Sequence, residues 1–320
     1  MKRLSILVIT LVLLLPLSGR SAKYAAEAFS LGVGGRALAM GGAVIAGPFD
    51  ATTAYWNPAG MNHLRGRSIV AMHAETFGSL LNHDYVSFVN ARPSKNGLLR
   101  AFGFYLYYLG GGGIKITELG PNNRPYVVRE ESHGDYLLAA SLSGVLLDRF
   151  DFGLTAKIIY RDLGTESGKG LTMDAGMIYQ ARRNVSLALM VTDITTGFIR
   201  YSGETFDDGA SYESIYPAVK PGLMVSKSYR EFTGRFAASG DIRFENIKYA
   251  AQYWAGPVSL DSHYGGEIGY KEMLFGRAGF DIGRFTAGGG VDVRNITVDF
   301  AYLHHSDLDE TFRVSAGYRW

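Results

Sequence analysis

The titratable side chains of this chain do not form a familiar catalytic pattern. Its seven histidines are scattered along the sequence, at positions 63, 73, 83, 133, 263, 304 and 305. Neither HExxH nor GxSxG occurs and there is no cysteine, so the spacings typical of metalloproteases, serine hydrolases and thiolate metal sites are missing. We therefore expect no enzymatic activity, no cofactor and no bound metal ion.

Charged residues of both signs instead alternate with apolar residues along many segments. Charges enclosed inside a protein must pair or be hydrated, so we expect salt bridges along an enclosed polar face. An ion-selectivity filter is the alternative, but such filters use mainly one sign of charge. The charged residues expected on the enclosed face are Asp151, Lys157, Arg161, Asp174, Lys220, Arg235, Asp241, Arg243, Arg277, Asp281, Arg284, Asp292, Arg294, Asp299, Arg313 and Arg319.

The alternation recurs in about fourteen segments, each long enough to cross a membrane as a tilted strand. A soluble β-sandwich also has many alternating strands, but it does not normally set aromatic residues on one face against arginines on the other. We predict an all-β fold, a transmembrane antiparallel β-barrel. The predicted strands are 67–77, 83–92, 97–109, 135–147, 150–163, 169–181, 184–194, 217–229, 232–244, 262–271, 273–282, 284–293, 295–304 and 311–320. The third and fourth are apolar on both faces, so we expect them to contact a plug or a ligand.

The last ten residues show the alternation most clearly. One face carries Phe312, Val314, Ala316, Tyr318 and Trp320, and the other carries polar residues. An apolar face towards lipid and a polar face towards the lumen are typical of membrane barrel strands. The terminal aromatic residue resembles the signal that bacterial outer-membrane barrels present to their assembly machinery. The resemblance implies that this machinery is a partner, with Phe312, Tyr318 and Trp320 as the assembly signal.

The longest connections between predicted strands are 110–134, 195–216 and 245–261. All three fall on one side of the membrane, as expected if they are extracellular loops opposite short periplasmic turns. Gly110 to Gly113 should make the first of them flexible. These loops carry apolar residues that either bind a ligand or partner or pack together as a lid. The residues are Ile114, Ile116, Leu119, Phe198, Ile199, Tyr201, Phe206 and Tyr212.

Residues 1–21 have the pattern of a secretory signal peptide, because Lys2 and Arg3 precede an apolar run and then small residues. The run is shorter than the roughly 20 residues of a membrane helix, so an uncleaved anchor is the less favoured alternative. The net charge of only +2 argues against a nucleic-acid partner. We predict location in the outer membrane of a Gram-negative-type bacterium, with outer-membrane lipid around the barrel.

Residues 22–66 do not alternate like the predicted strands. Asp50 is a suitable N-cap for a short helix, and Pro58 should end that helix and force Asn57 into an extended conformation. The glycine-rich part lacks the GxGxxG spacing of a nucleotide-binding loop. An open barrel of about fourteen strands would leak small solutes. We therefore expect this segment to form a hatch inside the lumen of the barrel at 67–320, with a periplasmic tail as the alternative.

Two short runs carry a more specific resemblance. The run Gly-Arg-Ala-Leu-Ala-Met-Gly-Gly-Ala at 35–43 and the run Trp-Asn-Pro-Ala-Gly at 56–60 resemble the N-terminal signature of the FadL superfamily, and are most similar to its shorter PorV/PorQ-like branch. The resemblance covers essentially the whole mature chain. It implies a hatch whose Asn-Pro-Ala tripeptide shapes a gate. The hatch or gate residues are then Asn57, Pro58, Ala59, Gly60, Trp56, Gly41 and Gly42.

The resemblance implies two functions from different classes. The first is binding or passive transport of a hydrophobic molecule, captured by the outward loops and released sideways or past the hatch. The second is a component of a type IX protein secretion system that handles cargo at the cell surface, as some PorV/PorQ-like proteins do. A general diffusion porin ranks third, because a plugged lumen opposes it.

Overall fold

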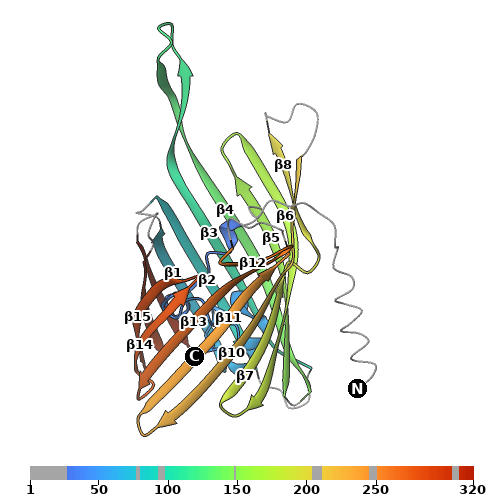
Figure 1. Cartoon of the computed structure of the whole chain (residues 1–320), viewed down its shortest axis with the longest axis vertical. Helices are drawn as coiled ribbons and strands as arrows, with labels where there is room; N and C mark the ends of the chain where they lie inside the picture. The colour runs from blue at the N-terminus through green and yellow to red at the C-terminus, as the bar shows by residue number, and fades with distance from the viewer. Residues whose placement is uncertain are drawn as a thin grey trace.

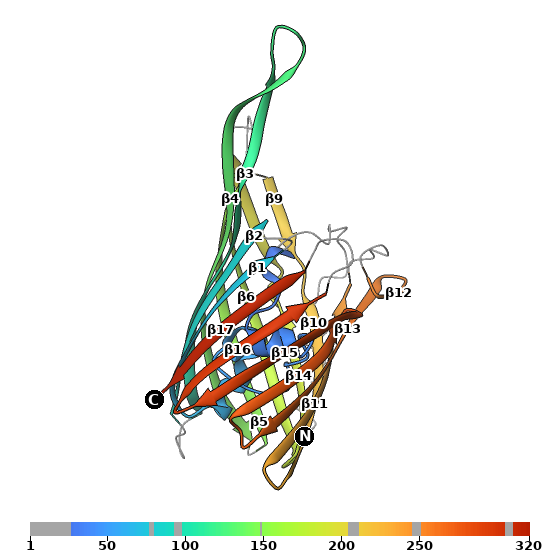
Figure 2. The ribbon, with the colours of Figure 1, turned by 90° about the vertical axis from the view of Figure 1, so that its left-hand side faces the viewer.

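The chain forms a closed barrel of fourteen antiparallel strands. The computed structural model describes residues 27–76, 80–92, 98–147, 149–203, 211–244, 251–304 and 310–320, so the predicted signal peptide lies outside the described residues. The ring closes where β1 pairs with β17 (Figures 1 and 2). The wall strands are β1 (Gly66–Thr76), β2 (Leu81–Ala91), β3 (Leu99–Leu119), β4 (Pro125–Leu147), β5 (Phe150–Asp162), β6 (Glu166–Arg182), β7 (Val185–Thr192), β10 (Ala218–Tyr229), β11 (Phe232–Arg243), β13 (Val258–Tyr270), β14 (Leu274–Asp281), β15 (Arg284–Val293), β16 (Ile296–Leu303) and β17 (Thr311–Arg319).

Each of the fourteen predicted segments corresponds to one wall strand, but two predicted loops are largely strands as well. The loop predicted at 110–134 consists mainly of the outer parts of β3 and β4, which continue as a ribbon far above the wall (Figure 2). The prediction was wrong here because Gly110 to Gly113 interrupt the side-chain pattern, whereas ladder hydrogen bonds use only the backbone. The loop at 195–216 contains β8 (Gly197–Gly203) and β9 (Ser211–Ile215), and β12 (Tyr253–Ala255) precedes β13.

The outer face of the wall is apolar and bordered by aromatic residues. Leu138 is 54% exposed and Ile268 is 64% exposed, which suits a surface in contact with lipid chains. Tyr108, Tyr136 and Tyr160 are ladder partners on β3, β4 and β5, with ring centroids 5.0 and 6.0 Å apart. Tyrosine is enriched at membrane–water interfaces, so this row marks one border of the lipid-facing band.

The described residues before the barrel, which we call the inner segment (27–65), lie inside the ring in both views (Figures 1 and 2). They contain η1 (Glu27–Phe29), α2 (Gly35–Ala39), α3 (Thr53–Trp56) and η2 (Pro58–His63). As predicted, Asn57 is extended, with φ −163° and ψ 103°. The helix begins slightly later than predicted, at Thr53. Asp50 still makes a cap-like contact in the preceding turn, because its carboxylate accepts from the backbone and hydroxyl of Thr52. No described helix is long and apolar enough to cross a membrane.

Inward-facing glycines of the wall make room for the inner segment. A Cβ at Gly265 of β13 would meet three atoms of Met40, with the Met40 Cβ at 2.7 Å. A Cβ at Gly222 of β10 would lie 2.9 Å from the Cβ of Ile45. On the opposite side, Gly153 of β5 would meet the Pro58–Ala59 backbone. The inner segment therefore lies against the wall on both sides of the lumen at van der Waals distance.

The main hydrophobic core lies between the inner segment and β1 to β5. It includes Phe29 and Met61 from the inner segment and Tyr85, Tyr105 and Tyr107 from the wall. The third and fourth strands were predicted to contact a plug or a ligand, and their inward faces do contact the inner segment. A hatch function for the inner segment and the predicted domain boundaries remain predictions.

Candidate ligand cavities

Cavities remain in the lumen on both sides of the inner segment. The larger, which we call the outer cavity, has a volume of about 440 Å³. It lies at the end of the barrel that carries the long connections, because its lining includes Thr76, the last residue of β1, and Thr311, the first of β17. The inner cavity, of about 310 Å³, lies at the opposite end and is lined by Ser68 and Arg319.

Apolar and charged groups line opposite sides of the outer cavity. The inner segment contributes Leu31, Leu38, Ile45 and Trp56. The wall contributes several ion pairs. Lys220 donates to Asp241 at 2.6 Å, and the ring of His263 lies 2.8 Å from Asp281. Arg243 crosses to the inner segment and pairs with Glu27 at 2.6 Å. The cavity is therefore amphipathic, with one apolar side and one polar side.

Arg313 is the exception to this pairing. Its side chain is almost completely buried, at 2% exposure, and lines the outer cavity. One nitrogen, Nη2, donates to the Leu31 carbonyl at 3.2 Å, but Nε and Nη1 have no partner in the described part of the chain. Leaving buried donors unsatisfied costs about 1–3 kcal/mol each. A residue that lines the cavity therefore carries two buried donors without a partner among the described residues.

His83 on β2 has a similar character. It is fully buried, and neither ring nitrogen has a partner among the described residues. Its ring packs against Tyr107 with centroids 4.4 Å apart. Sequence analysis missed His83 as a lumenal residue, although the alternation of β2 places it on the same face as Tyr85.

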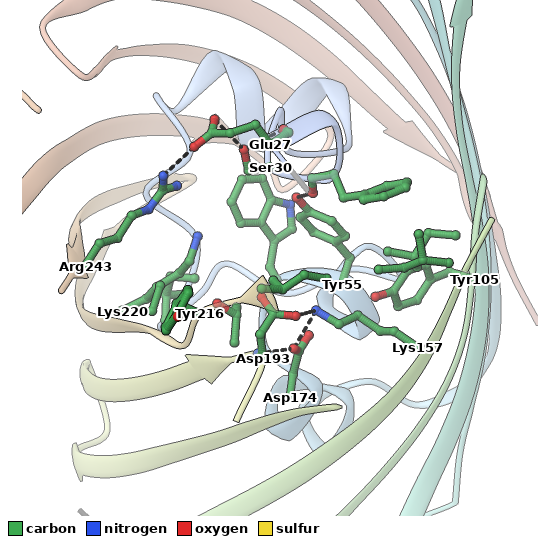
Figure 3. A pocket seen from close by; sticks show the side chains of 18 of the residues that line it. Glu27, Ser30, Tyr55, Tyr105, Lys157, Asp174, Asp193, Tyr216, Lys220 and Arg243 are labelled. Atoms are coloured by element: carbon green, nitrogen blue, oxygen red, sulfur yellow. Dashed lines mark hydrogen bonds and ion pairs between the residues drawn. The ribbon is translucent and has the colours of Figure 1, made fainter. Parts of the chain in front are cut away.

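A smaller pocket of about 100 Å³ adjoins the outer cavity and shares Glu27, Trp56 and Arg243 with it. Figure 3 shows Lys157 directed at Asp174 and Asp193 on one side of this pocket, with Nζ–carboxylate distances of 2.6 and 2.7 Å. Figure 3 also shows Tyr55 and Tyr105 beside the pocket. Burial raises the pKa of Tyr55, so it remains protonated and donates to the Phe29 carbonyl at 2.7 Å.

Beside the inner cavity, ion pairs join α2 to the wall. Glu267, which is fully buried, accepts from Arg36 at 2.7 Å, from Arg235 at 2.7 Å and from Arg277 at 2.6 Å. Arg277 also pairs with Asp299 at 2.7 Å. Burial alone would lower the pKa of Arg36, but the Glu267 carboxylate outweighs burial and raises it. The expected salt bridges between wall and inner segment are therefore present, and Glu267 is a central acceptor that sequence analysis missed.

The predicted gate residues occupy two different settings. Trp56 lines the outer cavity. Together with Arg36 and Thr52 it also lines a small gap, and Arg36 and Thr52 line the inner cavity as well. Its indole nitrogen donates to the Val33 carbonyl at 2.9 Å, and a Cβ at Gly42 would lie 3.6 Å from its ring. Trp56 and Gly42 are therefore at the boundary between the two cavities.

The other predicted gate residues are packed against the wall. Asn57 is fully buried and donates to the Ile45 carbonyl at 3.0 Å, while its side-chain oxygen accepts from Ala59. Pro58 and Gly60 are buried in the same turn, and Gly41 is in contact with the β14 backbone. This packing anchors the inner segment. A gating role for these residues remains a prediction.

The predicted loop residues do not form one surface. Ile114 and Leu119 are exposed on the projecting ribbon, at 45% and 69%, and Ile116 is partly exposed there. On β8 and β9, Phe198 and Tyr212 are exposed whereas Ile199 and Tyr201 are buried. The hydroxyl of Tyr201 accepts from Arg161 and donates to Glu213, each at 2.8 Å. Phe206 lies outside the described residues.

The aromatic residues of the predicted assembly signal face outwards. Phe312, Tyr318 and Trp320 are 50%, 46% and 50% exposed, and the Tyr318 and Trp320 rings stack with centroids 5.5 Å apart. Their role in assembly remains a prediction. In the described ranges, no group of three histidine, aspartate or glutamate side chains is arranged to hold a metal ion.

These features define a transmembrane β-barrel with a chain segment packed inside its lumen. The toluene transporter TbuX of Ralstonia pickettii has the same fold, with 14% identity, a TM-score of 0.57 and coverage of 90% of this chain and 98% of that chain. The monoaromatic hydrocarbon channel CymD is 11% identical, with a TM-score of 0.58 and coverage of 91% of this chain and 98% of that chain. The toluene transporter TodX of Pseudomonas putida is 11% identical, with a TM-score of 0.55 and coverage of 89% of this chain and 96% of that chain.

At these identities the likeness establishes the fold alone. The FadL-type barrel predicted from the sequence is confirmed at that level, whereas the PorV/PorQ-like branch remains a prediction. No protein-family model and no curated protein sequence matches the chain.

Proposed function

We propose that the barrel binds a small, largely hydrophobic molecule in the outer cavity and passes it across the outer membrane without an energy source. TbuX, CymD and TodX, named as hydrocarbon transporters or channels, share its fold. The observation that carries the proposal is the amphipathic outer cavity, whose lining combines aliphatic and aromatic side chains of the inner segment with Arg313, which has two unpartnered donors among the described residues.

The donors of Arg313 favour a ligand with an acceptor at one end, such as a carboxylate. Arginine forms charge-assisted hydrogen bonds with a carboxylate, and such a ligand would give Arg313 an acceptor that its unpartnered donors lack. The apolar part of the ligand would then lie on Leu38 and Trp56. From there the ligand reaches the inner cavity once the Trp56 ring moves, which makes Trp56 the gate in this proposal.

Quenching of Trp56 fluorescence by 9,10-dibromostearate tests binding in the cavity. The chain has three tryptophans, so the double substitution Trp254→Phe and Trp320→Phe leaves Trp56 as the only emitter. We expect saturable quenching, because bromine quenches only at contact and the cavity holds few ligands. A protein that keeps only Trp320, which faces lipid, should show quenching that rises in proportion to the ligand in the detergent phase.

Arg313→Gln gives the matched test of the polar end. We expect at least tenfold weaker binding of dibromostearate and unchanged binding of its methyl ester, which lacks the charged group. If quenching in the protein that keeps only Trp56 does not saturate, the proposed function is contradicted. A large, stable conductance of the unaltered protein in planar bilayers would favour the diffusion porin instead.

The secretion role has one feature in its favour. The ribbon formed by β3 and β4 projects beyond the wall (Figure 1) and carries exposed apolar residues, including Leu119 and Tyr126 at 69% and 52%. Such residues often mark an interaction surface. Replacing 112–132 by two glycines should block release of surface proteins in the native host but leave dibromostearate binding intact. Normal release would remove this candidate.

A further inference from the structure

Two cations lie side by side on the outer surface of β6 and β8. Lys169 and Arg200 are direct ladder partners and both side chains are exposed. They face outwards, because the residues that alternate with them, Gly168, Ile199 and Tyr201, are buried on the lumenal side. Like charges directly opposite each other destabilise an antiparallel strand pair. An anion bound between the two side chains would remove this repulsion.

The described part of the chain does not supply that anion. Neither Lys169 nor Arg200 forms an ion pair within it. Asp162, an outward carboxylate on β5, lies two residues from the partner of Lys169 and accepts from the backbone of Gly164 at 3.1 Å. Glu213 is directed inwards and bonded to Tyr201. Among the described residues, the charge of the pair is therefore not compensated.

The position of the pair identifies the kind of molecule. Lys169 is the first charged outward residue of β6 beyond an uncharged stretch that ends at Tyr179. The strand from Leu171 to Tyr179 spans about 26 Å, or about 20 Å of membrane depth at a tilt of about 40°. The pair therefore lies at the border of the apolar band, at headgroup level. The uncharged outward residues are Leu171, Met173, Ala175, Met177 and Tyr179.

Aromatic and apolar neighbours complete the site. The ladder places Tyr160 beside Lys169 and Tyr212 beside Arg200, and strands are about 4.8 Å apart. One group could therefore contact both cations and a tyrosine hydroxyl. The next outward row towards the apolar band is Leu171 and Phe198, which are 54% and 50% exposed and suit acyl chains.

We propose that Lys169 and Arg200 bind a phosphate group of lipid A from the outer leaflet of the outer membrane. A phosphate carries the compensating charge and several acceptor oxygens, which arginine binds with two parallel hydrogen bonds. The pair lies at the end of the barrel with the long connections, which faces the outer leaflet, and lipid A is the phosphorylated lipid of that leaflet. This inference does not rest on the proposed transport function.

Native mass spectrometry in a non-ionic detergent, with bisphosphorylated lipid A added, tests the site. We expect the double variant Lys169→Gln and Arg200→Gln to bind at least tenfold more weakly than the unaltered protein. The matched control is Lys227→Gln with Arg230→Gln, which removes two exposed cations at the opposite end of the barrel and should leave binding unchanged. Dephosphorylated lipid A should bind the unaltered protein as weakly as lipid A binds the double variant.

The charge-conserving swap Lys169→Arg with Arg200→Lys should retain binding, and it separates loss of charge from loss of structure. If the double glutamine variant does not fold, the two single substitutions serve instead, each with a partial loss expected. Binding of lipid A by the double variant at full strength would overturn the proposal. Equal binding of phosphatidylglycerol would overturn the assignment to lipid A.

Discussion

The two halves of the barrel wall hold the inner segment by different kinds of contact. Against β1 to β5 the contact is mainly a hydrophobic core. It is supplemented by hydrogen bonds from Ser87 and Tyr107 to inner-segment carbonyls and by polar contacts of Asn62 and His63 with Asp151. Against β11 to β17 it consists of glycine recesses and small apolar clusters around α2, of the buried pair of Arg36 with Glu267 and of the partly exposed pair of Glu27 with Arg243. We call these the apolar half and the ionic half.

The difference matters for movement. Apolar contacts are non-directional, so the inner segment can shift along the apolar half at modest cost. Buried ion pairs depend strongly on geometry, and breaking one leaves an uncompensated charge. The ionic half therefore fixes the position of the inner segment, and the apolar half contributes most of its buried surface. A ligand that moves Trp56 would be opposed mainly by the ionic half.

Glu267→Gln should give the largest effect. It removes the negative charge and one of the two acceptor oxygens that Arg36, Arg235 and Arg277 share, and breaking a buried pair costs about 3–5 kcal/mol. We expect a lower urea midpoint for the folded, heat-modifiable band in phospholipid bilayers, and a rise in conductance in planar membranes. Glu272→Gln is the control, because Glu272 also pairs with Arg235 but is 53% exposed, and such pairs contribute about 0–1 kcal/mol. Equal effects of both substitutions would remove the distinction between the halves.

Met61→Ala probes the apolar half. Met61 is fully buried and lies against Gly103 of β3, so its truncation leaves a cavity that costs about 2–5 kcal/mol. In the protein with Trp56 as its only tryptophan, we expect a red-shifted emission and easier quenching by acrylamide, because the inner segment loosens. The conductance should rise less than in Glu267→Gln, since the ion pairs remain. A larger conductance than in Glu267→Gln would show that the apolar half fixes the position.

The positions of the wall strands could be read from the sequence because period-2 alternation is a local signal. Alternation placed β17 at 311–320, and the structure places it at Thr311–Arg319. The same reasoning failed where glycine removed the side-chain pattern, at Gly110 to Gly113. Trp56 was predicted as a gate residue only through the resemblance to a family signature, and not from alternation.

The contacts of the site could not be predicted in the same way. Arg36 and Glu267 are 231 residues apart in the sequence, and nothing local indicates that they meet. Arg313 was expected to pair with a carboxylate. Its neighbours depend on the register between β17 and β1 and on which inner-segment carbonyl comes within reach, and a single sequence does not contain that information.

Gly265→Leu tests the glycine recess of the ionic half. Its side chain would meet Met40, and overpacking costs about 1–3 kcal/mol, so we expect displacement of α2 and a moderate rise in conductance. Gly266→Leu is the matched control on the same strand, because Gly266 faces outwards and a Cβ added there would lie 3.9 Å from the Ala278 carbonyl oxygen. If both variants conduct like the unaltered protein, α2 does not depend on this recess.

Tyr107→Phe should give the smallest effect, because it removes only the hydrogen bond from the hydroxyl to the Ala28 carbonyl and keeps the ring in the apolar core. A hydrogen bond of this kind contributes about 0.5–1.5 kcal/mol. We expect slightly easier acrylamide quenching of the sole Trp56, with an unchanged urea midpoint. Tyr108→Phe, on the outward face of the same strand, should change neither quantity. A loss as large as that of Met61→Ala would mean that directional bonds hold the inner segment on the apolar half too, and the contrast between the halves would then lie in charge alone.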